Sequence, residues 1–261
     1  MTSIKPFSHV SNSLEQIQWA IAIQNLCFCY PNEPNVLQDI NLHIRAGERI
    51  GVIGHNGCGK TTFFRLVCGV LKPISGEIVV FGEPILPGDF RPEIGLLFQD
   101  PDDQLFSASV RDDVAFGPQN MGLPPEEVDL RVQEAIALTG LQSLSHRPPH
   151  HLSGGEKQMV AIAGVLAMRP RIMLYDEPSA NLDLRARRRL IRFLQRSQET
   201  LLISAHDLEL ILEVCDRVIL MDEGRIVADG DPQHIMGNQE LMERHGLEKP
   251  HSLMPHRDPH H

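Results

Sequence analysis

The sequence has few aromatic residues, few cysteines and no long apolar run, and each shortage excludes a class of protein. One tryptophan, two tyrosines and five cysteines occur among 261 residues. So few cysteines in a chain of this length do not form a disulfide framework, and they indicate reduced thiols in the cytoplasm. The longest apolar run, Met159–Met168, is about half the length of a membrane span. We therefore expect another subunit to supply any membrane span.

Positive charge is also scarce. The chain has 24 Lys and Arg residues against 34 Asp and Glu residues, which gives a formal net charge of −10 and an isoelectric point of about 5.7. This acidic balance argues against a nucleic-acid partner, because that partner would itself be a polyanion. With 42% apolar residues, the chain can form one large domain or a domain with a smaller lobe.

Strand and helix patterns alternate along most of the chain. Apolar alternation and short apolar runs predict strands at 20–30, 41–45, 49–53, 77–81, 94–98, 172–175 and 200–204, with two further strands near the end. Helical patterns lie at 63–70, from 153 onward, at 184–197 and at 207–214. Such alternation is typical of an α/β fold with a mostly parallel core sheet.

The chain is expected to form one domain flanked by two tails. Residues 1–18 are polar, lack the apolar core of a signal peptide and are expected to be a flexible leader. Residues 19–240 would form the α/β domain, in which turn signals and amphipathic helix predict a helical subdomain at about 100–168. Residues 241–261 are rich in histidine and proline and are expected to be a poorly ordered tail.

A glycine-rich segment, GHNGCGKT at Gly54–Thr61, fits G-x-x-x-x-G-K-[ST] between a predicted strand and a predicted helix. Its glycines let backbone N–H groups point at phosphate oxygens, and the helix N-terminus adds its positive dipole end. Lys60 would reach the β- and γ-phosphates, and the Thr61 hydroxyl would bind Mg²⁺. Cys58 is either a thiol with a lowered pKa among amide dipoles or a small loop filler. The phosphate-binding candidates are Gly54, His55, Asn56, Gly57, Cys58, Gly59, Lys60, Thr61 and Thr62.

Two acids follow the buried strand at 172–175. Asp176 lies at the carboxyl end of a strand beside the phosphate loop, where a carboxylate can bind Mg²⁺ through water. Glu177 can orient and deprotonate an attacking water. The alternative is that both acids only cap the strand before a turn.

Two further motifs can face phosphate groups. The sequence LSGGEKQ places Ser153, Gly154 and Gly155 at the start of a predicted helix, which makes a second anion site. One nucleotide does not need two such loops in one subunit, so a second copy of the domain is expected to complete the site. His206 follows the strand at 200–204 and can hydrogen-bond a γ-phosphate and sense its loss. The alternative for Ser153 and for His206 is a helix cap.

These features follow one another in the order GHNGCGKT, Gln99, LSGGEKQ, LYDEP, SANLD and His206. This ordered set resembles the nucleotide-binding subunits of ABC transporters over about residues 20–235. The resemblance implies a P-loop NTPase fold of the ABC type, with a mostly parallel core sheet, an N-terminal antiparallel β-subdomain and a helical subdomain. It also implies an ATPase with ATP and Mg²⁺ as its cofactors.

The resemblance assigns roles to single residues. It implies a head-to-tail dimer in which Ser153 and Gly155 of one subunit contact the ATP held by the other. Tyr30 is expected to stack on adenine, for which an aromatic face is suited. The expected catalytic residues are Lys60, Gln99, Glu177 and His206, and the expected metal ligands are Thr61, Gln99 and Asp176.

The acidic segment FQDPDDQLF resembles one group within this family, the ATPase subunits of energy-coupling-factor transporters, which include cobalt and nickel importers. The resemblance implies a short helix behind Gln99 and a groove at Gln99–Phe106 that receives a transmembrane coupling subunit. A negative groove would suit basic coupling helices. The alternative for this segment is a solvated acidic turn.

The expected function is therefore ATP hydrolysis that drives uptake of a transition-metal ion or a vitamin. The expected partners are a second ATPase subunit, identical or related, the coupling subunit and a substrate-binding membrane subunit, with the chain peripheral at the cytoplasmic face of the membrane. The alternatives are an ordinary ABC importer for another small solute, a soluble ABC ATPase acting outside transport and a non-catalytic regulatory subunit. Decayed motifs would favour the last, but Lys60, Glu177 and His206 are all present.

Overall fold

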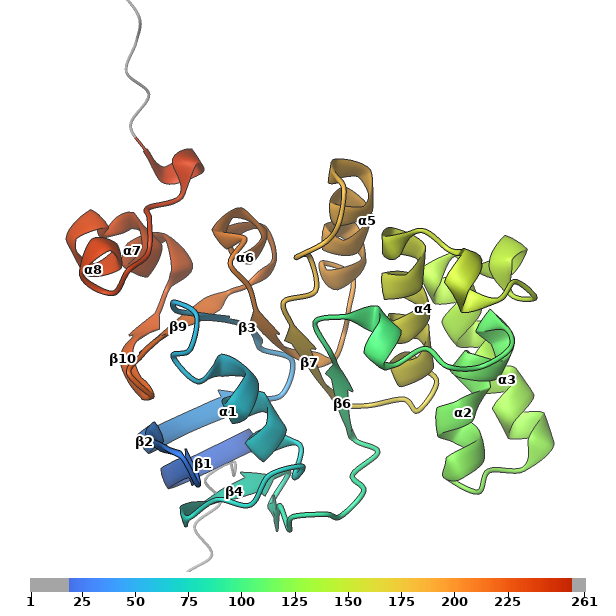
Figure 1. Ribbon diagram of the computed structural model, residues 1–261, viewed down its shortest axis with the longest axis horizontal. Helices are drawn as coiled ribbons and strands as arrows, with labels where there is room; N and C mark the ends of the chain where they lie inside the picture. The colour runs from blue at the N-terminus through green and yellow to red at the C-terminus, as the bar shows by residue number, and fades with distance from the viewer. Residues whose placement is uncertain (1–18, 255–261) are drawn as a thin grey trace, which may run out of the picture.

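Two sheets and a lobe of helices make up residues 19–254, which are the residues that the computed structural model describes (Figure 1). The expected leader at 1–18 and the last residues, 255–261, lie outside this part. The six-stranded core sheet has the order β10-β9-β3-β8-β7-β6, and the four-stranded sheet has the order β2-β1-β4-β5. The expected α/β fold with a mostly parallel core, an antiparallel subdomain and a helical subdomain is confirmed.

The core sheet is parallel except at one edge. Its strands are β3 (Arg49–Ile53), β6 (Ile94–Leu97), β7 (Ile172–Asp176), β8 (Thr200–Ser204), β9 (Arg217–Asp222) and β10 (Arg225–Gly230). Only the last of these pairs antiparallel to its neighbour. All residues of β7 and β8 are buried, because helices or the second sheet cover both faces. That is why both strands read as apolar runs rather than alternating patterns.

The antiparallel sheet is built from a long hairpin and two shorter strands. These strands are β1 (Trp19–Tyr30), β2 (Glu33–Arg45), β4 (Ser75–Val80) and β5 (Glu83–Pro84). The second strand is longer than the alternation at 41–45 predicted. Asn35 and Asp39 have φ angles of 62° and 52°, and the pairing with β1 shifts register several times. Such irregular residues interrupt the period of two that identifies a strand in sequence.

Three α-helices and three short 3₁₀ turns form the helical lobe beside β6 (Figure 1). The α-helices are α2 (Val110–Asn120), α3 (Pro125–Thr139) and α4 (Gly154–Leu166), and the turns are η1 (Pro101–Asp103), η2 (Gln142–Leu144) and η3 (Pro149–His151). α3 starts with proline followed by two acids, and it ends at Gly140 in the left-handed region with φ 68°. Proline and acids favour the first turn of a helix, and glycine favours its C-terminal cap.

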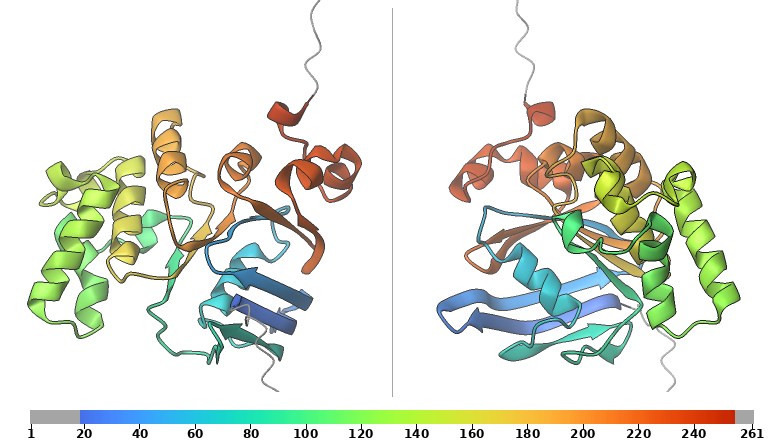
Figure 2. Two further views of the ribbon diagram at one scale, coloured as in Figure 1. Left: turned by 180° about the vertical axis from the view of Figure 1, so that it is seen from behind. Right: turned by 45° about the vertical axis from the view of Figure 1, so that its right-hand side comes forward.

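The remaining helices cover the core sheet. They are α1 (Lys60–Val67), α5 (Leu184–Leu194), α6 (Leu208–Val214), α7 (Pro232–Gly237) and α8 (Gln239–Arg244), followed by the 3₁₀ turn η4 (His251–Leu253). Figures 1 and 2 show α1 on the side of the sheet that faces the antiparallel strands, and α5 and α6 on the other side. Among residues 19–254, no helix is both long and apolar enough to cross a membrane.

The C-terminal segment differs from the expected loose tail. The boundary expected at residue 240 falls inside α8, and the chain stays packed up to Met254. Met242 is fully buried, and Leu247 packs against the core. Ser252 donates from its hydroxyl to Glu209 at 2.6 Å. The histidines and prolines dominate the composition here, but a few well-spaced apolar residues determine the packing.

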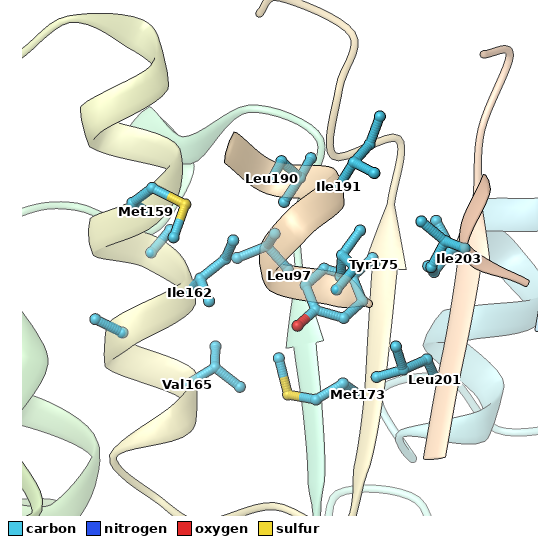
Figure 3. Packing of buried hydrophobic residues seen from close by; sticks show 14 of the residues in the cluster. Leu97, Met159, Ile162, Val165, Met173, Tyr175, Leu190, Ile191, Leu201 and Ile203 are labelled. Carbon is cyan, nitrogen blue, oxygen red and sulfur yellow. The ribbon is translucent and has the colours of Figure 1, made fainter. Parts of the chain in front are cut away.

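One buried cluster joins the helical lobe to the core sheet (Figure 3). Tyr175 lies at its centre, between β6, α4 and α5, and it is 0% exposed. Its hydroxyl has no hydrogen-bond partner among the described residues, and burial raises its pKa. The neighbours labelled in Figure 3 are Leu97, Met159, Ile162, Val165, Met173, Leu190, Ile191, Leu201 and Ile203.

Candidate active site

The phosphate loop leaves the end of β3 and enters α1, as its sequence predicts. Gly54, Gly57 and Gly59 have φ angles of 153°, 84° and 106°. A Cβ atom on Gly54 would lie 2.3 Å from the Met221 carbonyl oxygen, and one on Gly59 would lie 2.7 Å from Leu37 Cδ2. Only glycine fits both positions, because left-handed backbone and close contact coincide there. The loop therefore curls tightly in front of the N-terminus of α1.

Two side chains of this loop are buried with it. Lys60 Nζ donates to the Gly54 and His55 carbonyl oxygens at 2.8 and 3.1 Å, so the loop itself positions the ammonium group. Cys58 is 0% exposed, and burial raises the pKa of its thiol despite the nearby Lys60. Of the two alternatives for Cys58, the geometry favours the loop filler over a thiol with a lowered pKa, because the desolvation of a thiolate outweighs the charge of the lysine. Cys58 fills the loop.

Tyr30 lies beside the first turn of α1. Its hydroxyl is 3.3 Å from the Thr62 hydroxyl, and its ring packs edge-to-face on Phe28 with centroids 4.9 Å apart. Thr62 is buried, whereas Thr61 is exposed. This arrangement leaves Thr61 exposed, and it holds Tyr30 beside the start of α1. Metal binding by Thr61 stays a prediction. Adenine stacking on Tyr30 stays a prediction.

A carboxylate, an imidazole and an amide meet at the carboxyl ends of three neighbouring strands. Glu177 follows β7, His206 follows β8, and Gln99 follows β6. His206 Nε2 is 2.9 Å from Glu177 Oε1, and Gln99 Nε2 donates to Glu177 Oε2 at 3.2 Å. Parallel strands end at the same edge of a sheet, so their adjacency brings these residues together from far apart in the chain. The arrangement can hold and orient a general base.

Ser204 anchors the two acids, although it lies outside the motifs of the sequence. Its hydroxyl donates to Asp176 Oδ1 at 2.6 Å, and the Glu177 N–H donates to both Ser204 oxygens at 3.0 Å. Glu177 has a φ of 49°, a conformation that a glutamate adopts only when its surroundings enforce it. Asp176 and Ser204 are register partners in the sheet. A small polar residue at the end of the adjacent strand is the signal that could have revealed Ser204.

The donors expected to bind Mg²⁺ are consistent with that ion. Thr61 offers a hydroxyl, Asp176 a carboxylate that is 5% exposed, and Gln99 an amide oxygen. Oxygen ligands of this kind suit a hard cation such as Mg²⁺ better than a softer transition metal.

The LSGG segment lies away from the phosphate loop of the same chain. Ser153 is the N-cap of α4 and shares a capping box with Glu156: its hydroxyl and its N–H both contact Glu156 Oε2, at 2.7 and 2.8 Å. Figure 1 shows α4 in the helical lobe, separated from α1 by β7 and β6. Within one chain, Ser153 therefore serves as a helix cap, which is the alternative to its predicted role as an anion site. The exposed N-terminus of α4 remains available to a second subunit.

Two residues outside the sequence motifs, Asp222 and His245, contact the phosphate loop through His55. Asp222, at the end of β9, accepts from His55 Nε2 at 2.8 Å and from His245 Nδ1 at 2.6 Å. These contacts lower the pKa of Asp222, with the His245 bond as the largest cause. The C-terminal segment after α8 is thereby tied to the second residue of the loop.

Behind Gln99, a groove of about 320 Å³ runs between η1, α2 and α4. Phe106 and Phe116 are 66% and 47% exposed and pack edge-to-face at 4.7 Å. Two acids are already engaged: Asp102 pairs with Lys157 at 2.7 Å, and Asp113 is buried with its Oδ1 accepting from the Phe106 N–H. Aromatic rings thus make up much of the groove, while the exposed Asp103 also lines it and no lysine or arginine is among its described lining residues. The groove keeps acidic character, and the docking of a basic coupling helix stays a prediction.

Comparisons with known proteins give a consistent result. The sequence model described as ABC transporter matches residues 37–180. A Synechocystis sp. protein for which an ABC transporter ATP-binding role is proposed is 60% identical over 234 residues, which cover 90% of this chain and 82% of that protein. The energy-coupling factor transporter ATP-binding protein EcfA of Methanothermobacter thermautotrophicus is 44% identical over 88% of this chain and 76% of its own. The structure of CbiO1 from Clostridium perfringens, described as part of the ABC transporter complex CbiONQ, has a TM-score of 0.77 and 38% identity, and covers 87% of this chain and 94% of that one.

Proposed function

The chain belongs to the ABC transporter family and is an ATPase of its energy-coupling-factor group; from this premise we propose that it drives the import of a cobalt or nickel ion or a vitamin through membrane subunits. The observation that carries this proposal is the contact of Glu177 with both Gln99 and His206. Gln99 also borders the segment that forms the aromatic groove. One side chain therefore connects the hydrolysis site with a surface suited to a partner.

Hydrolysis would use these side chains in distinct roles. Glu177 would accept a proton from the water that attacks the γ-phosphate, and Gln99 and His206 would hold its two oxygens in place. Lys60 would exchange its carbonyl partners for the β- and γ-phosphate oxygens. Bound Mg²⁺ would neutralise charge that builds up on the phosphates. Ser204 would hold the Asp176 carboxylate in place and keep Glu177 in its left-handed backbone conformation.

The site would be completed by a second ATPase subunit. Each nucleotide lies at the N-terminus of α1, while the exposed N-terminus of α4 carries a second set of phosphate-facing N–H groups. We propose that Ser153, Gly154 and Gly155 of one subunit close over the nucleotide bound by the other. Closure and reopening would then move the helical lobe, and with it the groove beside Gln99.

The aromatic groove would receive a coupling helix of a membrane subunit, which would hold the chain at the cytoplasmic face of the membrane. Exposed rings that line a concave surface mark a protein interface. Phe90, Phe98, Phe106 and Phe116 all line this groove and are at least 36% exposed. An amphipathic helix with an apolar face fits such a surface.

The test is purification of the tagged chain from membranes in mild detergent, followed by identification of the proteins that accompany it. We expect two membrane proteins, one that docks and one that binds substrate, and the second would identify the cargo. Phe106→Glu should remove both, because a carboxylate would replace an exposed ring in the groove. Leu138→Glu is the matched control, since Leu138 is 70% exposed on the opposite side of the lobe.

Two outcomes would contradict the proposal. If no membrane protein accompanies the chain, it acts outside transport. If Phe106→Glu and Leu138→Glu behave alike, the groove is not the docking surface. Recovery of a different type of membrane subunit, with a soluble substrate-binding protein, would instead support an ordinary ABC importer for another small solute.

A further inference from the structure

A cavity of about 910 Å³ lies between the end of α3, the middle of α4 and one face of α5. From α4 it is lined by Met159 and Leu166, which are seven residues apart and share one face of the helix. The aromatic groove takes Val160, Ala161 and Gly164 from the opposite face of the same helix. The cavity is therefore separate from the proposed membrane-docking surface.

The α5 wall of this cavity is strongly basic. Four arginines recur within α5 at a spacing of three, four or seven residues, which places them on one helix face over roughly 10 Å at 1.5 Å per residue, and a fifth follows just after the helix ends at Leu194. They are Arg185, Arg188, Arg189, Arg192 and Arg196. This cluster is positively charged, although the whole chain has a formal net charge of −10.

Local partners neutralise only part of this charge. Arg188 pairs with Glu213, and Arg189 donates to the Thr139 and Gly140 carbonyl oxygens at the end of α3. Within residues 19–254, Arg185, Arg192 and Arg196 have no carboxylate within ion-pair distance, and all three are exposed. The carboxylate that lines the cavity in this part of the chain is Glu199, which accepts from the Gln198 N–H. Like charges held together in this way favour an anionic ligand.

The floor of the cavity is apolar. Leu138 is 70% exposed, and Phe193 and Leu166 are half-buried beneath the arginines. The volume lies within the range of small-molecule sites, roughly 300–1,000 Å³. The planar fork of arginine matches phosphate oxygens, and an aromatic ring or aliphatic floor suits a base or an acyl portion.

We propose that this cavity binds a small molecule of nucleotide size that carries several phosphate groups and an apolar or aromatic portion. A concave, partly apolar site favours such a ligand over a membrane surface or a nucleic acid strand. The ligand would bridge the helical lobe and α5, because Arg189 already links α5 to the end of α3. Ser153, at the N-terminus of α4, is about 9 Å along the helix axis from Met159, at 1.5 Å per residue. The proposed contact with a second subunit is therefore separate from this cavity.

The test is calorimetric titration of the full chain, with its phosphate loop saturated by Mg-ADP, using two probes. Inorganic tripolyphosphate tests phosphate recognition, and coenzyme A adds an adenine and an aliphatic arm. We expect one site per chain for each probe, with tighter binding of coenzyme A than of tripolyphosphate, because its aliphatic arm and adenine would contact the apolar floor. The variant Arg185→Gln/Arg192→Gln/Arg196→Gln should lower both affinities roughly tenfold or more, because charge-assisted hydrogen bonds are lost.

Two matched variants separate this site from general attraction. Arg111→Gln/Arg225→Gln/Arg244→Gln removes the same charge elsewhere and should change both affinities by less than about twofold. Leu138→Glu adds a carboxylate at the exposed floor and should weaken both probes without burying a charge. Absence of binding to the unmodified chain, an unchanged affinity of the first variant, or an equal loss in the Arg111 variant would each overturn the proposal.

Discussion

The contact of Glu177 with His206 predicts a non-additive effect of their substitutions on ATP hydrolysis. Glu177→Gln keeps the shape of the side chain but removes the carboxylate that can accept a proton. A positioned general base contributes about 10²–10⁴ in rate, which is about 2.7–5.4 kcal/mol at 1.36 kcal/mol per tenfold. We therefore expect kcat to fall by this factor while ATP binding is kept.

His206 lies 2.9 Å from Glu177, so part of its effect should act through that carboxylate. We expect His206→Ala alone to lower kcat by about 10- to 100-fold, and to add much less than this in the Glu177→Gln background. Residues that act as a unit are non-additive in this way. The coupling energy should therefore reach at least half of the single His206 effect.

The assay is phosphate release at saturating Mg-ATP by the complex purified from membranes, with nucleotide affinity measured in parallel. Glu240→Gln is the control, since Glu240 is exposed and pairs only with Arg244 among the described residues. Full additivity of the two substitutions would refute the reasoning, because the contact seen between the side chains would then have no role in hydrolysis. Loss of nucleotide binding in Glu177→Gln would refute it as well.

Three further predictions concern stability and the phosphate loop. Tyr175→Phe should raise the free energy of unfolding by about 1 kcal/mol, measured by urea denaturation, because it removes a buried hydroxyl without a partner; a loss of stability would show that the hydroxyl is satisfied. Asp222→Asn should lower the urea midpoint at neutral pH, and the deficit should shrink as pH falls below about 4, because a carboxyl whose pKa is lowered on folding stabilises the protein above its unfolded pKa and loses that effect in acid; a deficit that does not change with pH would contradict this. Gly59→Ala should destabilise the chain by about 1–3 kcal/mol and weaken nucleotide binding, since φ is 106° and the new Cβ would lie 2.7 Å from Leu37 Cδ2; wild-type binding would disprove the close contact.

The phosphate loop and the strand-and-helix order could be predicted from sequence because they depend on neighbouring residues. A glycine pattern between a strand and a helix determines where its N–H groups point, whatever the rest of the chain does. Lys60 and Asp176 could therefore be proposed as site residues from their local positions alone. The same local reading failed for β2, where Asn35 and Asp39 interrupt the alternation, and for the C-terminal segment, where histidine and proline obscured the packing of Met242.

The tertiary structure alone decided which distant residues meet and which charges are neutralised. The order β6-β7-β8 brings Gln99, Glu177 and His206 together, and the register between β7 and β8 places Ser204 under both acids. Burial raises the pKa of the Cys58 thiol, and pairing with Lys157 engages Asp102 in η1, beside the groove. Strand order, register and burial arise from contacts between residues far apart in the chain. Desolvation and ion pairing depend on those contacts. A sequence pattern therefore shows which ionisable side chains are present, but not which of them remain charged and accessible.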